Sequence, residues 1–189
     1  VALGPQALNF FINRRDALFP GTPLVFGGTG QENLSQVMAL PGVAGLPMNL
    51  SVAPILDALL SIRPQTKELV LVYGTSGFDR NWRDTAVRQC ARFADRVKIT
   101  ECPVLPLEEL KSYLGDLSDE KAVVFLTYFQ SPTGETYTPA WVAKDIAASS
   151  PVPVVGAYDT YLGSGVLGVS VSPFKEEGLT LGRAMKRVL

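Results

Sequence analysis

The sequence predicts an α/β protein of two lobes, with parallel sheets flanked by helices. Short runs rich in β-branched residues alternate with longer amphipathic stretches through most of the chain, which is the pattern of βαβ units. A Gly- and Pro-spaced passage at 31–49 breaks this alternation and indicates a crossing between lobes. The alternation then resumes and continues to Tyr158, which indicates a second, independent sheet.

The first lobe is expected to span residues 1–48. A strand at 1–3 leads through Pro5, which suits a first helical turn, into a helix at 6–18. A second strand follows at 23–26, and one helical turn is expected at 32–38. With two strands and one certain helix, this lobe is expected to be incomplete, because a full lobe would need an earlier βαβα stretch.

The second lobe is expected to span residues 49–162. Asn49 or Ser51 can cap a helix that runs to Ile62 and stops at Arg63-Pro64. Four strands and three crossover helices follow. The expected strands are 68–73, 97–101, 122–128 and 152–158, and the expected helices are 81–94, 107–114 and 139–148.

The tail at 163–189 departs from the repeat and is expected to return as a turn, a short strand and a closing helix at 176–189. One face of this closing helix is apolar at three- and four-residue spacing. Its expected members are Leu179, Leu181, Ala184, Met185 and Val188. Four other apolar residues fit the buried faces of helices and are expected in the core. They are Trp82, Trp141, Leu110 and Leu114.

Composition excludes several classes of function. The chain has 17 basic and 18 acidic residues and a net charge of −1, so charge alone would not draw it to nucleic acid or to an anionic membrane. Its apolar runs fall far short of the ~20 residues that span a bilayer, which predicts a soluble chain. The sequence contains no histidine, which removes Ser-His and Cys-His nucleophiles and most zinc sites.

No catalytic constellation, metal site or cofactor is therefore predicted. Asp79, Asp84, Glu135 and Asp159 lie near the ends of expected strands, but no spacing pairs them with a positioned nucleophile. The two cysteines, Cys90 and Cys102, could form a disulfide or remain as buried free thiols. The free thiols are the simpler interpretation, because unpaired cysteines are commonly buried.

Ligands of open α/β sheets collect outside the carboxyl ends of the strands, so the loops at 27–30, 74–79, 128–136 and 157–165 are the candidate sites. The run GTSG at 74–77 could present backbone N–H groups to a carboxylate or phosphate. The alternative is a tight turn into a helix capped by Asp79 or Asn81. No Walker lysine follows, so nucleotide triphosphate hydrolysis is not supported.

A second glycine-rich run, GSGVLG at 163–168, matches the dinucleotide fingerprint letter for letter. The residues after it alternate like a strand, whereas the fingerprint needs a helix there to meet the pyrophosphate. We therefore interpret this run as a glycine turn.

Aromatic and polar residues follow the third and fourth strands of the second lobe. Tyr128-Phe129-Gln130 and Tyr158-Asp159-Thr160-Tyr161 supply the ring faces and hydrogen-bonding groups that line small-molecule pockets. The alternative is that these rings pack between the strand ends. As a cluster, they form the best candidate site in the sequence.

The arrangement of elements resembles the type I periplasmic-binding-protein fold. Several passages are similar in local sequence to the uncharacterised ABC-transporter substrate-binding proteins and to the sensor regions of bacterial histidine kinases. The passages are LFPGTPLVF at 18–26, LVLVYGTS at 69–76, VFLTYF at 124–129, PVPVVG at 151–156 and DTYLG at 159–163. The resemblance implies that two lobes close on a ligand held between strand ends. The residues that it implies for this pocket are Gly28, Thr29, Gly74, Thr75, Tyr128, Gln130, Tyr158 and Asp159.

The resemblance also implies a function. We expect a non-catalytic, periplasmic or extracytoplasmic small-molecule sensor domain of a membrane histidine kinase, which signals to the membrane-anchored kinase portion by lobe closure and can form a homodimer. The first alternative is the solute-binding component of an ABC transporter, which would act on a permease. Two further alternatives are a cytosolic α/β enzyme that binds a nucleotide or phosphorylated sugar at 74–77, and an interaction module without a ligand.

Overall fold

In the computed structural model, which describes residues 1–30, 34–48, 50–170 and 174–188, the chain forms two compact units. Unit 1 contains Val1–Leu50 and Ser172–Leu189, and unit 2 contains Ser51–Val171. Each unit has its own parallel sheet, with helices packed against it. The predicted two-lobed α/β fold is therefore confirmed.

Unit 1 is built on three parallel strands in the order β1-β2-β3. The strands are β1 (Ala2–Leu3), β2 (Leu24–Thr29) and β3 (Val43–Pro47), and the helices are α1 (Pro5–Leu18), α2 (Leu34–Met38) and α7 (Phe174–Val188). The expectation of two strands was wrong, because the passage expected to be irregular contains β3. Its short run VAGLP carries Gly and Pro, which are uncommon in strands and concealed it.

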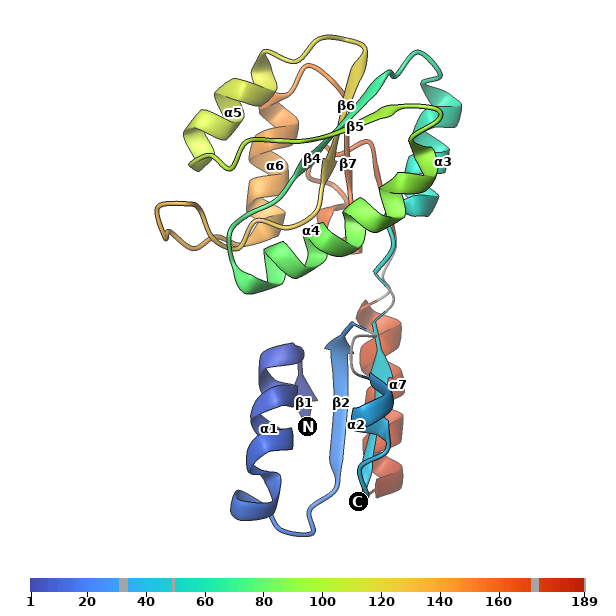
Figure 1. Cartoon of the computed structure of the whole chain (residues 1–189), viewed down its shortest axis with the longest axis vertical. Helices are drawn as coiled ribbons and strands as arrows, with labels where there is room; N and C mark the ends of the chain where they lie inside the picture. The colour runs from blue at the N-terminus through green and yellow to red at the C-terminus, as the bar shows by residue number, and fades with distance from the viewer. Residues whose placement is uncertain (31–33, 49, 171–173, 189) are drawn as a thin grey trace. The chain divides into compact units, whose positions relative to one another are not determined.

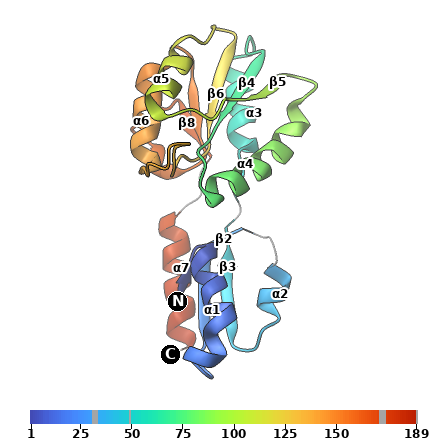
Figure 2. The same cartoon turned by 60° about the vertical axis from the view of Figure 1, so that its left-hand side comes forward.

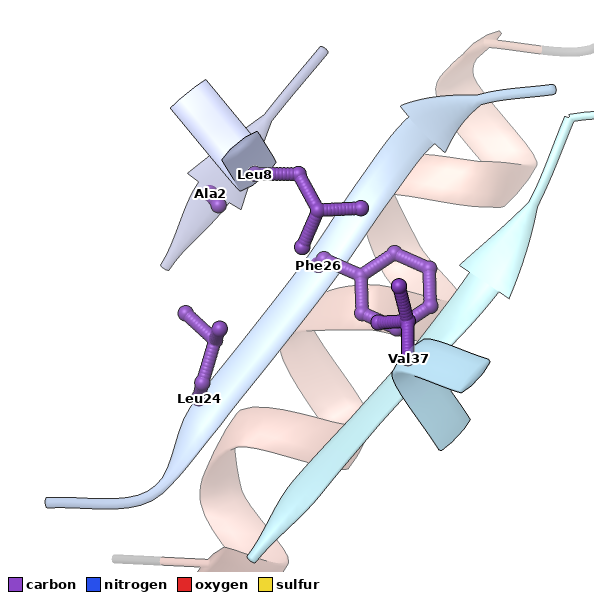
Figure 3. Close-up of a cluster of buried hydrophobic side chains, with 5 residues drawn as sticks. All are labelled: Ala2, Leu8, Leu24, Phe26 and Val37. Atoms are coloured by element: carbon purple, nitrogen blue, oxygen red, sulfur yellow. The ribbon is translucent and has the colours of Figure 1, made fainter. Parts of the chain in front are cut away.

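The helices of unit 1 cover both faces of its sheet. Leu8 of α1 and Val37 of α2 lie on the same side of β2 as Phe26, and together with Ala2 and Leu24 they form a buried apolar cluster (Figure 3). Helix α7 contacts β2 and β3, and Figure 1 shows it across β2 from α1. Unit 1 is therefore a three-layer αβα unit.

Phe26 fixes which residue can stand opposite it on β3. Gly45 pairs with Phe26 in the parallel register, and the Phe26 ring occupies the space that a side chain at Gly45 would need. A Cβ added at Gly45 would lie 2.5 Å from the carbonyl oxygen of Phe26 and 2.5 Å from its ring. Gly45 is thus required because Phe26 approaches it closely, and not because the backbone turns there.

The closing helix α7 begins two residues earlier than predicted and uses a partly different apolar face. Leu181 is buried, and one of its methyl groups fills the space beside Gly27 of β2. Leu179 is 48% exposed, so its predicted place on the buried face was wrong, because two residues turn a helix by about 200°. Ala184 and Met185 are half-buried as that face requires, whereas the side chain of Val188 lies outside the described residues.

Unit 2 is a five-stranded parallel sheet in the order β5-β4-β6-β7-β8. Its helices α3 and α4 lie on one side of the sheet, and α5 and α6 on the other (Figures 1 and 2). The strands are β4 (Glu68–Val72), β5 (Lys98–Glu101), β6 (Lys121–Phe125), β7 (Val154–Gly156) and β8 (Gly168–Val169). The helices are α3 (Ala53–Ile62), α4 (Gly77–Cys90), α5 (Leu107–Gly115) and α6 (Pro139–Ser149), with short 3-10 turns at Ala91–Phe93 and Asp159–Tyr161.

The order of elements in unit 2 follows the prediction, and the differences lie at their ends. Helix α4 begins four residues before the predicted start, since Ser76 is its N-cap in place of Asp79 or Asn81. Helix α3 starts after Val52 without a side-chain cap, so Ser51 does not cap it, and Asn49 lies outside the described residues. The glycine run at 163–168 turns and leads into β8, which begins at Gly168, and this confirms that the run is a turn followed by a strand.

The core of unit 2 lies on both faces of β4 and β6, whose residues from the second position onward are buried. Trp82, Leu110 and Leu114 are buried as predicted. Trp141 is 74% exposed, so its predicted core position was wrong. The inward face of α6 contains Val142 and Ile146, and Trp141 is offset from it by about 100°.

Both cysteines are free and buried, which confirms the thiol interpretation over the disulfide. Burial raises the pKa of Cys90 to about 11 and that of Cys102 to about 12. We expect a thiol-specific reagent at pH 8 to modify neither cysteine in the folded protein and both in urea, because the thiolate is the reactive form. Modification of the native protein at the rate seen in urea would contradict this burial.

The contact between Gly45 and Phe26 gives a prediction for stability. We expect Gly45→Ala to destabilise unit 1 by ~1–3 kcal/mol, because the added methyl group overlaps the backbone and ring of Phe26. Hydrogen exchange of the β2 and β3 amides would measure the loss. The control is Gly30→Ala, whose added Cβ meets no atom of the described residues within 4 Å and should change stability by no more than ~0.5 kcal/mol. Equal protection in the two variants would rule out the proposed constraint.

Candidate functional site

The connections of unit 2 place a topological switch point between β4 and β6. The crossover through α4 leads from β4 to β5 at one side of the sheet, whereas the crossover through α6 leads from β6 to β7 at the other. Ligands of open α/β sheets bind outside the carboxyl ends of the strands at such a point. The candidate site is therefore formed by the loops that follow β4 and β6, joined by the one that follows β7.

A buried carboxylate, that of Asp79, lies at the centre of this edge. Asp79 is fully buried on the first turn of α4, and its Oδ1 accepts a hydrogen bond of 2.6 Å from the hydroxyl of Thr127. Its Oδ2 accepts from the backbone N–H of Ser76 at 3.0 Å and from that of Phe129 at 3.1 Å. One side chain thus joins the end of β4, the start of α4 and the end of β6.

Helix α4 begins in a reciprocal capping box. The hydroxyl of Ser76 accepts from the N–H of Asp79 at 3.1 Å, while Asp79 accepts from the N–H of Ser76. The chain's own carboxylate and hydroxyl therefore take up donors that an anionic ligand would need. The sequence signal for this was Ser-x-x-Asp at 76–79, a capping-box pattern.

Gly74 and Thr75, two predicted site residues, hold the loops after β4 and β6 together. The Thr75 hydroxyl donates to the backbone oxygens of Gln130 at 3.1 Å and Ser131 at 2.8 Å, and its N–H donates to Gln130. A Cβ added at Gly74 would lie 2.6 Å from Oδ2 of Asp79 and 2.6 Å from the carbonyl oxygen of Gln130. The predicted turn is thus present, and ligand contact at these two residues stays a prediction.

The loop after β6 folds on itself as a small hairpin. Ser131 donates its N–H to the carbonyl of Glu135 and accepts from the Glu135 N–H with its hydroxyl, and Gly134 turns with φ +93°. The predicted site residue Gln130 donates its side-chain amide to the carbonyl of Gly134 at 3.3 Å. The hairpin is therefore held by its own hydrogen bonds.

Tyr128 points away from solvent, and its role in the structure is packing. It is 1% exposed, its hydroxyl donates to the carbonyl of Leu105 at 2.7 Å, and its ring lies edge-on to that of Tyr137. Burial raises the pKa of Tyr128 to about 12. This phenol is therefore a hydrogen-bond donor throughout the neutral range.

Three rings meet at the carboxyl end of β7. The Tyr158 ring lies 6.5 Å from that of Trp82 and 5.7 Å from that of Tyr161, whose hydroxyl donates to the carbonyl of Leu126. Burial chiefly raises the pKa of Tyr161. Asp159, the next predicted residue, is half-buried with its Oδ1 turned inward. The structure thus places the ring of Tyr158 beside that of Trp82, which is buried as the sequence predicted.

Phe78 and Phe129 form an aromatic pair at the same edge that sequence reasoning did not single out as a pair. Their rings pack edge to face at 5.6 Å, and Phe129 is 41% exposed. Phe78 is on the first turn of α4, and Phe129 is held by its backbone bond to Asp79. The available signal was the position of Phe78 between Gly77 and the capping residue Asp79.

Gly28 and Thr29, the remaining predicted site residues, end β2 in unit 1. Gly28 has φ +68°, a conformation that favours glycine, and the Thr29 carbonyl accepts from the N–H of Met48. Thr29 is 5% exposed, and its hydroxyl has no hydrogen-bond partner among the residues that the structure describes. These two residues belong to a different unit from the other six.

Metal and membrane sites are also addressed by the structure. Within residues 1–30, 34–48, 50–170 and 174–188, no group of three or more acidic or cysteine side chains is placed to hold a metal ion. No helix in these ranges combines the length and the apolar character needed to cross a bilayer.

The carboxylate of Asp79 gives a prediction. We expect Asp79→Ala to destabilise unit 2 by about 3 kcal/mol, because the buried donors of Thr127, Phe129 and Ser76 lose their acceptor. Urea unfolding followed by tryptophan fluorescence would measure it, since both tryptophans lie in unit 2.

The matched control for this experiment is Asp84→Ala on the same helix. Asp84 is exposed and pairs with Arg83, which keeps its contact with Glu101. This variant should stay within ~0.5 kcal/mol of the wild type. Similar losses of unfolding free energy in both variants would show that Asp79 does not hold the loops after β4 and β6 together.

Comparisons with known proteins show the fold. No family model and no curated protein matches the chain. Among solved structures, a conserved domain protein from Vibrio cholerae O1 biovar El Tor str. N16961 is similar, with a TM-score of 0.69 and 16% sequence identity. The match covers 98% of this chain, which spans 62% of the length of that protein. The similarity supports the two-unit α/β fold described above.

Proposed function

We propose that the chain is a non-catalytic small-molecule-binding domain, and that unit 2 contributes the carboxyl edge of its sheet to the binding site. The observation that carries this proposal is the exposed ring of Phe129, paired with Phe78 at the β4–β6 switch point. An exposed aromatic face at that position suits a small ligand with an apolar or aromatic part. The half-buried Asp159 supplies a polar group at the same edge.

The chemistry of this edge supports binding over catalysis. Tyr128 has its pKa raised to about 12 by burial, so it is poorly matched to proton transfer at neutral pH. The carboxylate of Asp79, which is central to the site, has acceptor bonds on both oxygens from the chain itself. The thiols Cys90 and Cys102 are buried, and burial raises the pKa of each.

The same observations disfavour the nucleotide or phosphosugar alternative at 74–77. A phosphate there would compete with Asp79 for the N–H of Ser76 and with the Ser76 hydroxyl for the N–H of Asp79. Two negative charges on one helix terminus would also repel each other. A binding site for an anion at this turn would first require Asp79 to leave.

We propose further that binding serves an extracytoplasmic receptor, as the sensor part of a membrane histidine kinase. The sequence resemblance to sensor regions and the two-unit fold support this proposal. The same binding step would serve the solute-binding component of an ABC transporter. In either setting the ligand would shift the population of conformations by binding one of them better.

A thermal-shift screen of small metabolites tests this function. We expect at least one compound to raise the melting temperature, because a ligand that binds the folded state stabilises it by mass action. Phe129→Ala should weaken the binding of that compound ~10-fold, as expected for truncation of a central aromatic contact.

The control for Phe129 is Val104→Ala. Val104 is also an exposed apolar residue, 43% exposed in the loop that follows β5, and it is not part of the aromatic pair. Its truncation should leave affinity unchanged. A library without any stabilising compound, or equal binding by wild type and Phe129→Ala, would count against the proposal.

A further inference from the structure

Helix α6 carries a tryptophan on its outer face. Trp141 is 74% exposed, although a buried Trp side chain is among the largest apolar contributions that one residue can make to packing. A single exposed apolar side chain is common on protein surfaces and needs no explanation by itself. The significance of Trp141 therefore depends on the residues that surround it on the helix.

Trp141 begins a stripe of four exposed residues on α6. Trp141, Lys144, Asp145 and Ala148 are all exposed, and they follow one another at the spacing i, i+3, i+4 and i+7. Residues at this spacing share one face of a helix. The opposite face of α6 is buried within unit 2, so the stripe points away from the core.

The two charges of the stripe flank the line that joins Trp141 to Ala148. At about 100° per residue, Trp141 and Ala148 lie within ~20° of each other around the axis, and Lys144 and Asp145 lie about 50° to either side. The two charged residues are adjacent in sequence, so they differ by only ~1.5 Å along the axis. Neither of them is in an ion pair with another residue that the structure describes.

This pattern is complementary to itself in one orientation. When two copies of a helix pack in parallel across a two-fold axis, the left flank of each faces the right flank of the other. Lys144 of each copy would then face Asp145 of the other at nearly the same height, and both pairs would attract. In an antiparallel pair each flank faces its own copy, so Lys144 would meet Lys144 and Asp145 would meet Asp145.

We propose that the stripe on α6 is a self-association surface, which binds the same stripe of a second copy of this chain in parallel across a two-fold axis. The Trp141 rings of the two copies pack against each other, and two reciprocal ion pairs between Lys144 and Asp145 fix the orientation. Ala148 is small and allows the two backbones to approach. This inference is independent of the proposed binding function.

The size of the stripe sets the strength of the association. Helix α6 has 11 residues and is therefore ~16 Å long. Two Trp side chains bury roughly 300–500 Å² together, which is well below the ~1,200 Å² at the lower end of stable interfaces. We therefore expect a weak dimer, with a Kd on the order of 10–100 μM.

Sedimentation velocity over a range of concentrations tests the surface on the full 189-residue chain. We expect Trp141→Ala to weaken dimerisation at least ~10-fold, because a central aromatic contact is lost from both copies. The matched control is Ile62→Ala. Ile62 is 64% exposed at the end of α3, on the other side of the sheet, and its truncation should leave the Kd unchanged.

Charge reversal tests the orientation. Lys144→Asp gives each copy two acidic residues in the stripe, and Asp145→Lys gives each copy two basic ones, so each variant alone should dimerise ~10-fold more weakly than the wild type. An equimolar mixture of the two variants should dimerise again, because every acidic residue then faces a lysine. Asp95→Lys is the control, since it makes the same charge change at an exposed residue beyond the end of α4.

Three results would overturn the proposal. A wild-type chain that stays monomeric at ~1 mM does not self-associate, and Trp141 would then serve a different partner. A dimer that Trp141→Ala leaves unchanged uses another surface. If mixing the two charge variants restores no dimer, the parallel pairing is wrong. The metabolite screen tests the binding function separately, so none of these results bears on it.

Discussion

The carboxylate of Asp79 is the interaction on which the arrangement of unit 2 depends. It is fully buried, and its two oxygens accept from the loop before α4 and from the loop after β6. A buried charge is tolerated in a protein only when hydrogen bonds replace its hydration. Asp79 meets that condition with bonds to three residues, and in doing so it fixes where β4 and β6 end and where Phe129 is presented.

This arrangement explains why the carboxyl edge of unit 2 differs from an anion-binding edge. In many α/β proteins the first turn of a helix offers free N–H groups to a phosphate. Here the capping box uses two of those groups, the N–H of Ser76 and that of Asp79, and Thr75 donates to the backbone oxygens of the facing loop. The feature of this edge that remains exposed, and on which the proposed binding function rests, is the aromatic surface at Phe129.

Unit 1 depends on a constraint of another kind. Phe26 fills the centre of its apolar cluster, so the facing strand must have a glycine at position 45. On the opposite face, Leu181 of α7 fills the space beside Gly27. Both faces of β2 are therefore specified by one large side chain set against one glycine. Surface ion pairs such as Arg92 with Asp57 contribute little by comparison, because solvent screens exposed charges.

The sequence by itself determined the class of the fold and the order of elements in unit 2, because strand and helix periodicities are local properties of the chain. It also determined that the chain lacks histidine chemistry. Only the tertiary structure decided that VAGLP is a strand, since β3 exists through its pairing with β2 and through the Phe26 ring. It likewise decided that Asp79 is internal, that Trp141 faces solvent, and that the rings of Trp82 and Tyr158 lie side by side. Such facts depend on which loops and faces meet after folding, and residues far apart in sequence carry no local signal of that meeting.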